Sequence, residues 1–421
     1  MSNRSIFSLI LLVSFFFCFI MQASAAISGG SVAGNAAADL VVNTSDADYN
    51  ISFDTDVGAT ANQLWIIFPA GYAITNGDLG TSSVTDGTTP ARISVNGIPR
   101  QVDNVTGDSV GRKITIVLSS AYDLGTGTGT SFRIVSGVQN PTAVGATGTF
   151  TIDSDAAGET EQSNVAGVTL TPGAAHHFVV TGTASQDAGA DNELTVTAKD
   201  EWGNTATSYD GAHDLTFSGP SVAPDSTNPT VEGTNVGTSQ SVTFASGVTN
   251  GSNLTLKPYK AEATTVDVTD GSVSSAGDAS WDLDLTVNPA TATIMAFSQQ
   301  PAGSTSGSAL TTQPIVTAYD DYDNIDTDFV ETITLSTAAA GSLGGDVDVA
   351  ASSGVATFVN VSYNATVDGQ SFTLLADDEG ALAQIESSSV NSNVVATKLV
   401  FTQQPSANAT SATAFAQQPI V

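Results

Sequence analysis

The sequence has few of the residues that usually carry out chemistry. Its 421 residues include one cysteine and three histidines, and aromatic residues make up only 7%. With so few nucleophiles and general bases, we do not expect an enzyme, a catalytic residue or a bound organic cofactor. The lone Cys18 has no partner in the chain for a disulfide, so hydrophobic cores must supply the stability.

Positive charge is also scarce. Ten Lys and Arg residues against 42 Asp and Glu residues give a formal net charge of −32. Nucleic acids and anionic membrane surfaces would repel such a chain, so neither is expected as a partner. The hydrophobic fraction of 41% is large enough to fill several small cores, which argues against a disordered protein.

The N-terminus has the features of a secretory signal peptide. Arg4 precedes a nearly unbroken apolar run from Ile6 to Met21, and Ala23-Ser24-Ala25 supplies a cleavage site of small residues. The run is shorter than the roughly 20 residues that a membrane-spanning helix needs. We expect residues 1–25 to be removed on export. The mature chain would then be extracellular or at the cell surface, with no transmembrane segment.

Two motifs recur along the chain at nearly constant spacing. Phe297-Ser-Gln-Gln-Pro301 returns as Phe401-Thr-Gln-Gln-Pro405, and Gln313-Pro-Ile-Val316 returns as Gln418-Pro-Ile-Val421. Two anchors at almost the same offset rarely arise by chance, so we predict tandem repeats. The chain stops at Val421 within an expected strand, and we therefore expect it to be a fragment of a longer protein.

Proline-containing joints at Pro172 and Pro289 mark the expected boundaries. The predicted layout is a signal peptide at 1–25, an N-terminal β-sandwich domain at 26–172, repeats at 175–289 and 292–395, and the start of a truncated repeat at 396–421. Apolar residues alternate with polar ones in segments such as Lys113–Leu118 and Asp282–Val287. Period-two patterning, with Thr and Val abundant and Gly, Asn and Asp in the gaps, predicts an all-β chain of tandem Greek-key sandwiches.

The repeats resemble a known family. The segment Leu194-Thr-Val-Thr-Ala-Lys-Asp-Glu-Trp-Gly-Asn-Thr205, followed by Asp214-Leu-Thr-Phe217, is similar to bacterial immunoglobulin-like (Big) repeats of the invasin/intimin type, which belong to cell-surface proteins. Val316–Asn324, with Ile333-Thr-Leu335 and Val355-Ala-Thr-Phe358, shows the same order. The resemblance covers residues 175–421 and implies Ig-like sandwiches and adhesion at the cell surface. Asp323 replaces the turn glycine in the later copy, which weakens the match there.

An acidic turn is the sharpest candidate for a bound ion. Asp320, Asp321, Asp323, Asp326 and Asp328 place five carboxylates within nine residues. Hard oxygen ligands are what calcium prefers, although the spacing lacks the glycine and distal glutamate of an EF-hand. The alternative is a solvated hairpin turn whose charges face water.

Three functions fit these observations. The first is a secreted or cell-surface structural and adhesive protein, whose tandem sandwiches form a stalk that presents a binding region to an unknown protein or glycan ligand. The second is a non-catalytic accessory region of a large secreted polysaccharide-active enzyme. The third is a calcium-stiffened component of a surface layer.

Overall fold

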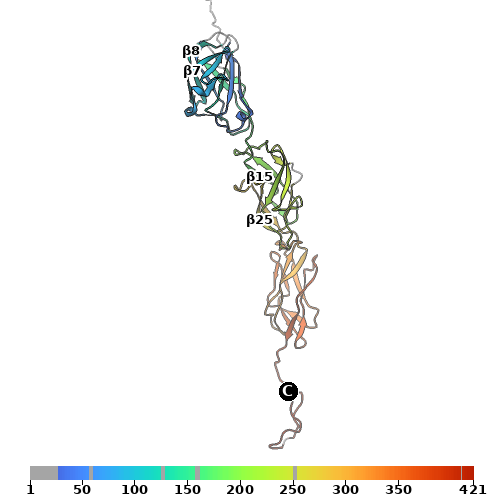
Figure 1. Cartoon of the computed structure of the whole chain (residues 1–421). Coiled ribbons are helices and arrows are strands. Elements are labelled where there is room, and N and C mark those ends of the chain that lie inside the picture. The colour runs from blue at the N-terminus through green and yellow to red at the C-terminus, as the bar shows by residue number, and fades with distance from the viewer. Residues whose placement is uncertain (1–26, 56–59, 125–128, 157–161, 250–253, 409) are drawn as a thin grey trace, which may run out of the picture. The chain divides into compact units, whose positions relative to one another are not determined.

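A computed structural model describes residues 27–55, 60–124, 129–156, 162–249, 254–408 and 410–421 (Figure 1). The predicted signal peptide therefore lies outside the described residues. Within them, the only helical elements are three short 3-10 turns, η1 (Ala37–Leu40), η2 (Asn76–Asp78) and η3 (Thr81–Ser83). No helix among these residues is long and apolar enough to cross a membrane. The prediction of an all-β, Ig-like sandwich fold is confirmed.

The chain forms two compact units. The first ends at Ala174 and also includes the turn Asp200–Ala206, and the second contains Ala175–Lys199 and the residues from Thr207 onward. Strand pairing divides the described residues into three groups, 27–171, 177–288 and 294–393, and every hydrogen-bonded sheet lies inside one group. The domain limits themselves stay a prediction.

The first group contains one ten-stranded sheet and two small ladders. The sheet runs β1-β2-β9-β6-β7-β8-β3-β12-β13, with β5 paired to β9, and the ladders are β10-β4 and β11-β14. The strands are β1 (Ile27–Gly34), β2 (Tyr49–Thr55), β3 (Thr60–Ile67), β4 (Ala73–Ile74), β5 (Val84–Thr85), β6 (Arg92–Val95), β7 (Ile98–Asp108), β8 (Lys113–Asp123), β9 (Thr130–Ile134), β10 (Val138–Gln139), β11 (Gly145–Ala146), β12 (Phe150–Ser154), β13 (Gln162–Val165) and β14 (Thr169–Leu170).

The long strand β7, labelled next to β8 in Figure 1, pairs with β6 through its first residues and with β8 from Val102 onward. Alternate residues of β8 point inward, so Ile114, Ile116 and Leu118 are buried. Tyr49 is buried against the rings of Phe68, Tyr72 and Phe150 at centroid distances of 5.9, 6.0 and 6.3 Å. A single apolar core therefore holds this sandwich together.

The second group has an eight-stranded sheet and a four-stranded sheet. Their orders are β15-β18-β23-β22-β19-β25-β26-β16 and β17-β24-β20-β21. The strands are β15 (His177–Thr181), β16 (Ser185–Asp187), β17 (Asn192–Glu193), β18 (Thr195–Lys199), β19 (Gly211–Ser218), β20 (Thr230–Val231), β21 (Thr234–Asn235), β22 (Ser239–Ala245), β23 (Val248–Thr249), β24 (Thr255–Lys257), β25 (Glu262–Thr269) and β26 (Leu283–Asn288). Phe178, Phe217 and Phe244 fill the interior.

The third group has four smaller sheets. They run β27-β29-β33, β28-β38-β35, β32-β30-β36-β37 and β31-β34. The strands are β27 (Ile294–Gln299), β28 (Ser304–Thr305), β29 (Ile315–Tyr319), β30 (Thr332–Ser336), β31 (Ser342–Gly344), β32 (Asp348–Ala350), β33 (Val355–Thr357), β34 (Ser362–Asn364), β35 (Gln370–Phe372), β36 (Leu375–Asp377), β37 (Ile385–Glu386) and β38 (Val390–Asn393). Phe358, Tyr363 and Phe372 lie in its core.

Candidate functional site

The turn from Asp200 to Asn204, which follows β18, is organised by one carboxylate. Oδ1 of Asp200 accepts hydrogen bonds from the backbone N–H groups of Trp202 and Asn204, both at 2.9 Å. Oδ2 accepts one from the N–H of Gly173 and one from Nδ2 of Asn204, both at 3.0 Å. Gly173 directly follows Pro172, so the carboxylate fixes the turn to the backbone of the joint.

The amide of Asn204 extends this network. Its Nδ2 also donates to the carbonyl oxygen of Thr142 at 2.8 Å. Gly203, just before it, has a φ of 83°, a left-handed conformation that glycine adopts without strain. The turn therefore groups with the first unit, as the division of the chain shows.

The second unit repeats this arrangement at Asp320, after β29. Oδ1 of Asp320 accepts from the N–H groups of Tyr322 and Asn324, both at 2.9 Å. Oδ2 accepts from the N–H of Ala290 at 3.0 Å and from Nδ2 of Asn324 at 2.9 Å. Ala290 follows Pro289 as Gly173 follows Pro172. We call each set, consisting of the aspartate, the asparagine four residues later and the N–H after the joint proline, an Asp–Asn clasp.

Asn324 also bonds to the loop between β24 and β25. Its Nδ2 donates to the carbonyl oxygen of Tyr259 at 2.8 Å, and its Oδ1 accepts from the N–H of Ala261 at 2.8 Å. The side-chain amide thus pairs with this loop as a neighbouring backbone would. The rings of Tyr322 and Tyr259 lie 4.9 Å apart at 55° and add apolar contact beside these hydrogen bonds.

A glycine makes room for this contact. A Cβ atom on Gly189 would overlap the hydroxyl oxygen of Tyr322, and Gly189 also has a φ of 78°. A larger residue at position 189 would have to displace the Tyr322 side chain and adopt a strained backbone conformation, so it would be destabilising.

Burial of the clasp aspartates is offset by their hydrogen bonds. Asp200 and Asp320 are only 1% and 0% exposed, and an unpaired carboxylate at such a position would be strongly destabilising. Burial alone would raise the pKa of Asp200. The hydrogen bonds from Asn204, Gly173 and Trp202 outweigh it, and the pKa lies below its ordinary value. The described geometry therefore keeps this charge without a cation.

Two other predicted calcium ligands bond to the same joint. Oδ2 of Asp326 accepts from the N–H of Ala292 at 2.8 Å, and Oδ1 of Asp321 accepts from the hydroxyl of Thr293 at 2.6 Å. Together with Asp320, these carboxylates hold the backbone and hydroxyl groups of residues 290–293. The concentration of aspartates in this turn is thus partly explained by their hydrogen bonds to residues 290–293.

The remaining two predicted ligands, Asp323 and Asp328, are exposed. Asp323 has a φ of 61°, in the place of Gly203 in the other clasp. Among the described residues, no three or more His, Cys, Asp or Glu side chains are grouped so that they could hold a metal ion. The structure therefore does not bring the five carboxylates together as a ligand set, and calcium binding stays a prediction.

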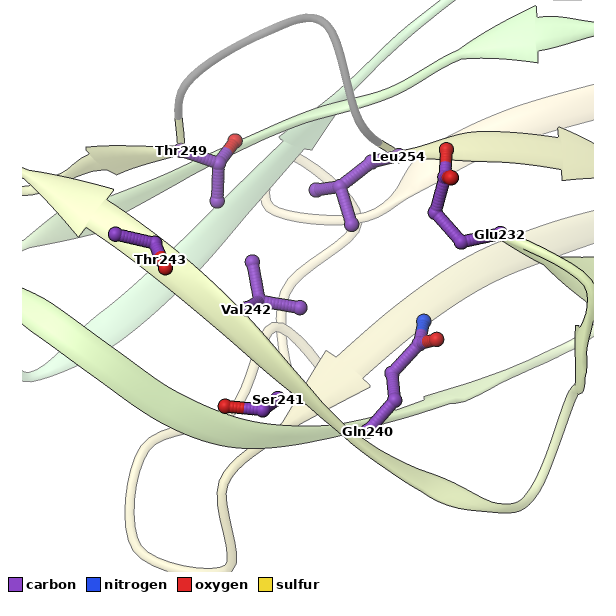
Figure 2. A pocket seen from close by; sticks show the side chains of 7 residues that line it. All are labelled: Glu232, Gln240, Ser241, Val242, Thr243, Thr249 and Leu254. Carbon is purple, nitrogen blue, oxygen red and sulfur yellow. The ribbon is translucent and has the colours of Figure 1, made fainter.

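The described surface also has hollows, two of which are larger than 300 Å³. One, of about 390 Å³, lies in the second group of strands and is lined by Glu232, Gln240, Ser241, Val242, Thr243, Thr249 and Leu254 (Figure 2). Residues 250–253, which join Thr249 to Leu254, are not described, so we assign no ligand to it. The other, of about 310 Å³, lies beside the joint and has Asp187, Asp326, Asp328 and Glu331 in its lining.

Sequence reasoning singled out the aspartates but missed the asparagines. Asn204 and Asn324 occupy the same place in the two aligned copies, and each is four residues after an aspartate. This shared spacing, found beside two proline joints, is the signal that could have identified the clasp.

Comparisons with known proteins give only distant likenesses. No family model and no curated protein sequence matches the chain. Among solved structures, the Escherichia coli adhesin FdeC is 15% identical and has a TM-score of 0.31, with 88% of this chain and 98% of that chain covered. Invasin, a bacterial integrin-binding protein, is 12% identical with a TM-score of 0.30, over 88% of this chain and 60% of that chain.

The surface layer protein SbsC is also similar. Its domains 1–6 are 13% identical with a TM-score of 0.23, over 91% of this chain and 56% of that chain. The chain thus spans less than two thirds of the solved invasin and SbsC structures. TM-scores this low do not place the chain in a family, and the likeness to immunoglobulin-like repeats of the invasin/intimin type stays a resemblance.

Proposed function

We propose that the chain is an exported structural or adhesive protein of the cell surface, in which tandem β-sandwiches act as a stalk for a binding region. The role is mechanical, and catalysis is not part of it. The ligand is a surface protein or glycan.

The recurrence of the Asp–Asn clasp is the observation that carries this proposal. A chain that transmits force or projects a tip needs joints that keep their geometry. Both proline joints have their first N–H bonded to a buried carboxylate, at 3.0 Å in each case. The same amide also bonds to a carbonyl of the segment before the joint, Thr142 in one clasp and Tyr259 in the other. The whole set is repeated at both prolines, which supports a structural role for the chain.

The composition supports the surface location. A leader followed by a mature chain without cysteine fits export, and the charge of −32 keeps copies soluble and mutually repelling in a crowded layer. Acidic side chains also disfavour a role at nucleic acids.

Small-angle X-ray scattering on the mature chain tests the stalk. We expect an elongated particle, and Asn204→Ala with Asn324→Ala should broaden the distribution of interatomic distances while each sandwich stays folded by circular dichroism. Asn104→Ala, at an exposed position of β7, is the matched control and should leave the scattering unchanged. A compact particle would contradict the stalk. Unchanged scattering of the double variant would show that the clasps do not contribute to it.

A further inference from the structure

Two adjacent histidines at the start of β15 turn their rings toward each other. Neighbouring residues of a strand ordinarily point to opposite faces of the sheet, so such a pair is not expected to meet. His177 is the first residue of β15, and His176 lies just before it. Their Nδ1 atoms are nevertheless 3.4 Å apart, and the ring planes are nearly perpendicular, at 83°. Two imidazole nitrogens thus lie within reach of one small ligand.

Contacts inside the second group of strands hold both rings in place. The ring of His177 is stacked on the indole of Trp281, with centroids 4.0 Å apart and planes at 16°. Trp281 is itself fixed to β15, because its carbonyl oxygen accepts from the N–H of Val180 at 2.8 Å. The backbone N–H of His176 donates to the carbonyl oxygen of Lys199 at 2.7 Å, and the His176 ring lies edge-on to Trp281. The pair is therefore arranged before any ligand binds, which lowers the entropic cost of binding.

The surroundings of the pair favour a cation that arrives from solvent. His176 is exposed, whereas His177 is only 6% exposed, so a ligand can approach from the His176 side and meet a fixed second ring. The carboxylate of Asp278 adds negative charge nearby. Its pKa is lowered, above all by hydrogen bonds from Ser280 and also by the charge of His177. A negative local field attracts a cation and repels an anion.

The separation of the two nitrogens, 3.4 Å, matches that of two ligands on one metal ion. With metal–nitrogen bonds of about 2.0–2.1 Å and a tetrahedral angle, two histidine nitrogens are about 3.3–3.4 Å apart. Imidazole nitrogen suits zinc, copper and nickel, and copper binds most tightly among the divalent ions of the first transition row. The alternative is a hydrogen bond from one Nδ1–H to the other Nδ1, for which 3.4 Å is long.

We propose that His176 and His177 form a site for a divalent transition-metal ion, which both Nδ1 atoms ligate. Among the described residues, no three or more His, Cys, Asp or Glu side chains are grouped to hold a metal, so water completes the coordination. Two protein ligands make this site weaker than a structural zinc centre with four. The site does not depend on the stalk, and it differs in chemistry from the predicted calcium site, because calcium prefers oxygen ligands.

Titration of the mature chain with copper(II) chloride tests the site through Trp281. Bound copper(II) quenches the fluorescence of a nearby indole, so the emission should fall saturably with one ion bound per chain. His176→Ala keeps the backbone N–H that bonds to Lys199. It should weaken binding by roughly tenfold or more, since even the loss of an outer-shell partner has an effect of this size. His213→Ala removes the third histidine of the sequence and is the matched control, which should bind as the parent does. Excess magnesium chloride in every sample occupies the carboxylates, which suit that ion.

Trp281→Phe separates binding from its optical signal. It keeps an aromatic ring against His177, so calorimetric titration with copper(II) should still show one ion per chain, while the saturable loss of fluorescence should disappear. Equal copper affinity of the parent and His176→Ala would overturn the proposal and leave the two rings as a hydrogen-bonded pair. So would the absence of saturable quenching up to millimolar copper, or its persistence in Trp281→Phe.

Discussion

At the scale of single residues, the side chains of the clasp asparagines, Asn204 and Asn324, each form hydrogen bonds to several groups. Asn324 joins a buried carboxylate to a carbonyl oxygen and an N–H of another segment, so its two side-chain polar atoms satisfy three partner groups. Such side chains are costly to remove because their former partners stay buried or half-buried without a replacement.

Asn324→Ala should therefore lower the free energy of unfolding by about 1–3 kcal/mol, because a typical hydrogen bond contributes about 0.5–1.5 kcal/mol and several are lost. Urea denaturation of the mature chain measures the change. Asn324→Asp should be more destabilising at neutral pH, since it places a second carboxylate where Nδ2 now lies 2.9 Å from Asp320. Equal stability of the aspartate variant and the parent would contradict the clasp.

The lowered pKa of Asp200 predicts how the stability of the fold depends on pH. Its pKa is lowered in the folded protein, so its ionised form contributes stability above the ordinary aspartate pKa, and that contribution is lost as pH falls through the lowered folded pKa. Asp200→Asn cannot accept the same bonds, because an amide nitrogen would face the donors of Gly173 or Asn204. The melting temperature of the variant should lie below that of the parent at pH 6, and the gap should narrow on acidification below the ordinary aspartate pKa. A gap that stays constant down to pH 2 would show that the ionised form is unimportant.

At the scale of elements, the Gln-Pro pairs show how a strand tolerates proline. Pro314 stands just before β29, and the amide of Gln313 pairs with Val361 in place of a ladder bond. Gln313→Ala should cost about 1–3 kcal/mol of unfolding free energy, because it leaves the N–H and carbonyl of Val361 without this partner. Gln418→Ala, which removes the equivalent amide from an exposed hairpin, should change global stability by less than about 0.5 kcal/mol. Chemical denaturation followed by circular dichroism compares the two.

The strands could be predicted from the sequence because their signal is local. The alternation at Lys113–Leu118 became part of β8, and that at Asp282–Val287 became most of β26, with Leu283, Leu285 and Val287 buried. The role of the acidic turn could not be predicted in this way. Whether a carboxylate binds a cation, water or an N–H group depends on residues far away in sequence, such as Ala290 and Ala292. These residues donate backbone N–H groups, and their apolar side chains give no sign of the contact in the sequence. Asp326 was therefore grouped with the other acids, although it is buried against the joint.

At the scale of the whole molecule, the effect of calcium on stability distinguishes a metal site at residues 320–328 from a turn held by hydrogen bonds alone. A ligand that binds only the folded state raises stability by RT ln(1 + [L]/Kd). The clasp occupies the oxygens of Asp320 with N–H groups. Calcium at 5 mM, which is several times the Kd of about 0.1–1 mM of weak extracellular sites, should therefore leave the melting temperature unchanged relative to sodium chloride of equal ionic strength. A calcium-specific rise that Asp326→Asn abolishes would instead support the predicted metal site.

The excess of acid also sets an order of events on acidification. Asp and Glu side chains ordinarily titrate near pH 4, so the charge of −32, and with it the repulsion between copies, disappears around there. Without that repulsion, copies of the chain are free to associate. The Asp200 carboxylate, with its lowered pKa, should still be ionised at that pH.

Light scattering should therefore rise near pH 4 while near-ultraviolet circular dichroism stays native, and the loss of tertiary signal should follow only at lower pH. Loss of tertiary signal before association would mean that the acidic joints, rather than the repulsion between molecules, are the first structures that acid disrupts.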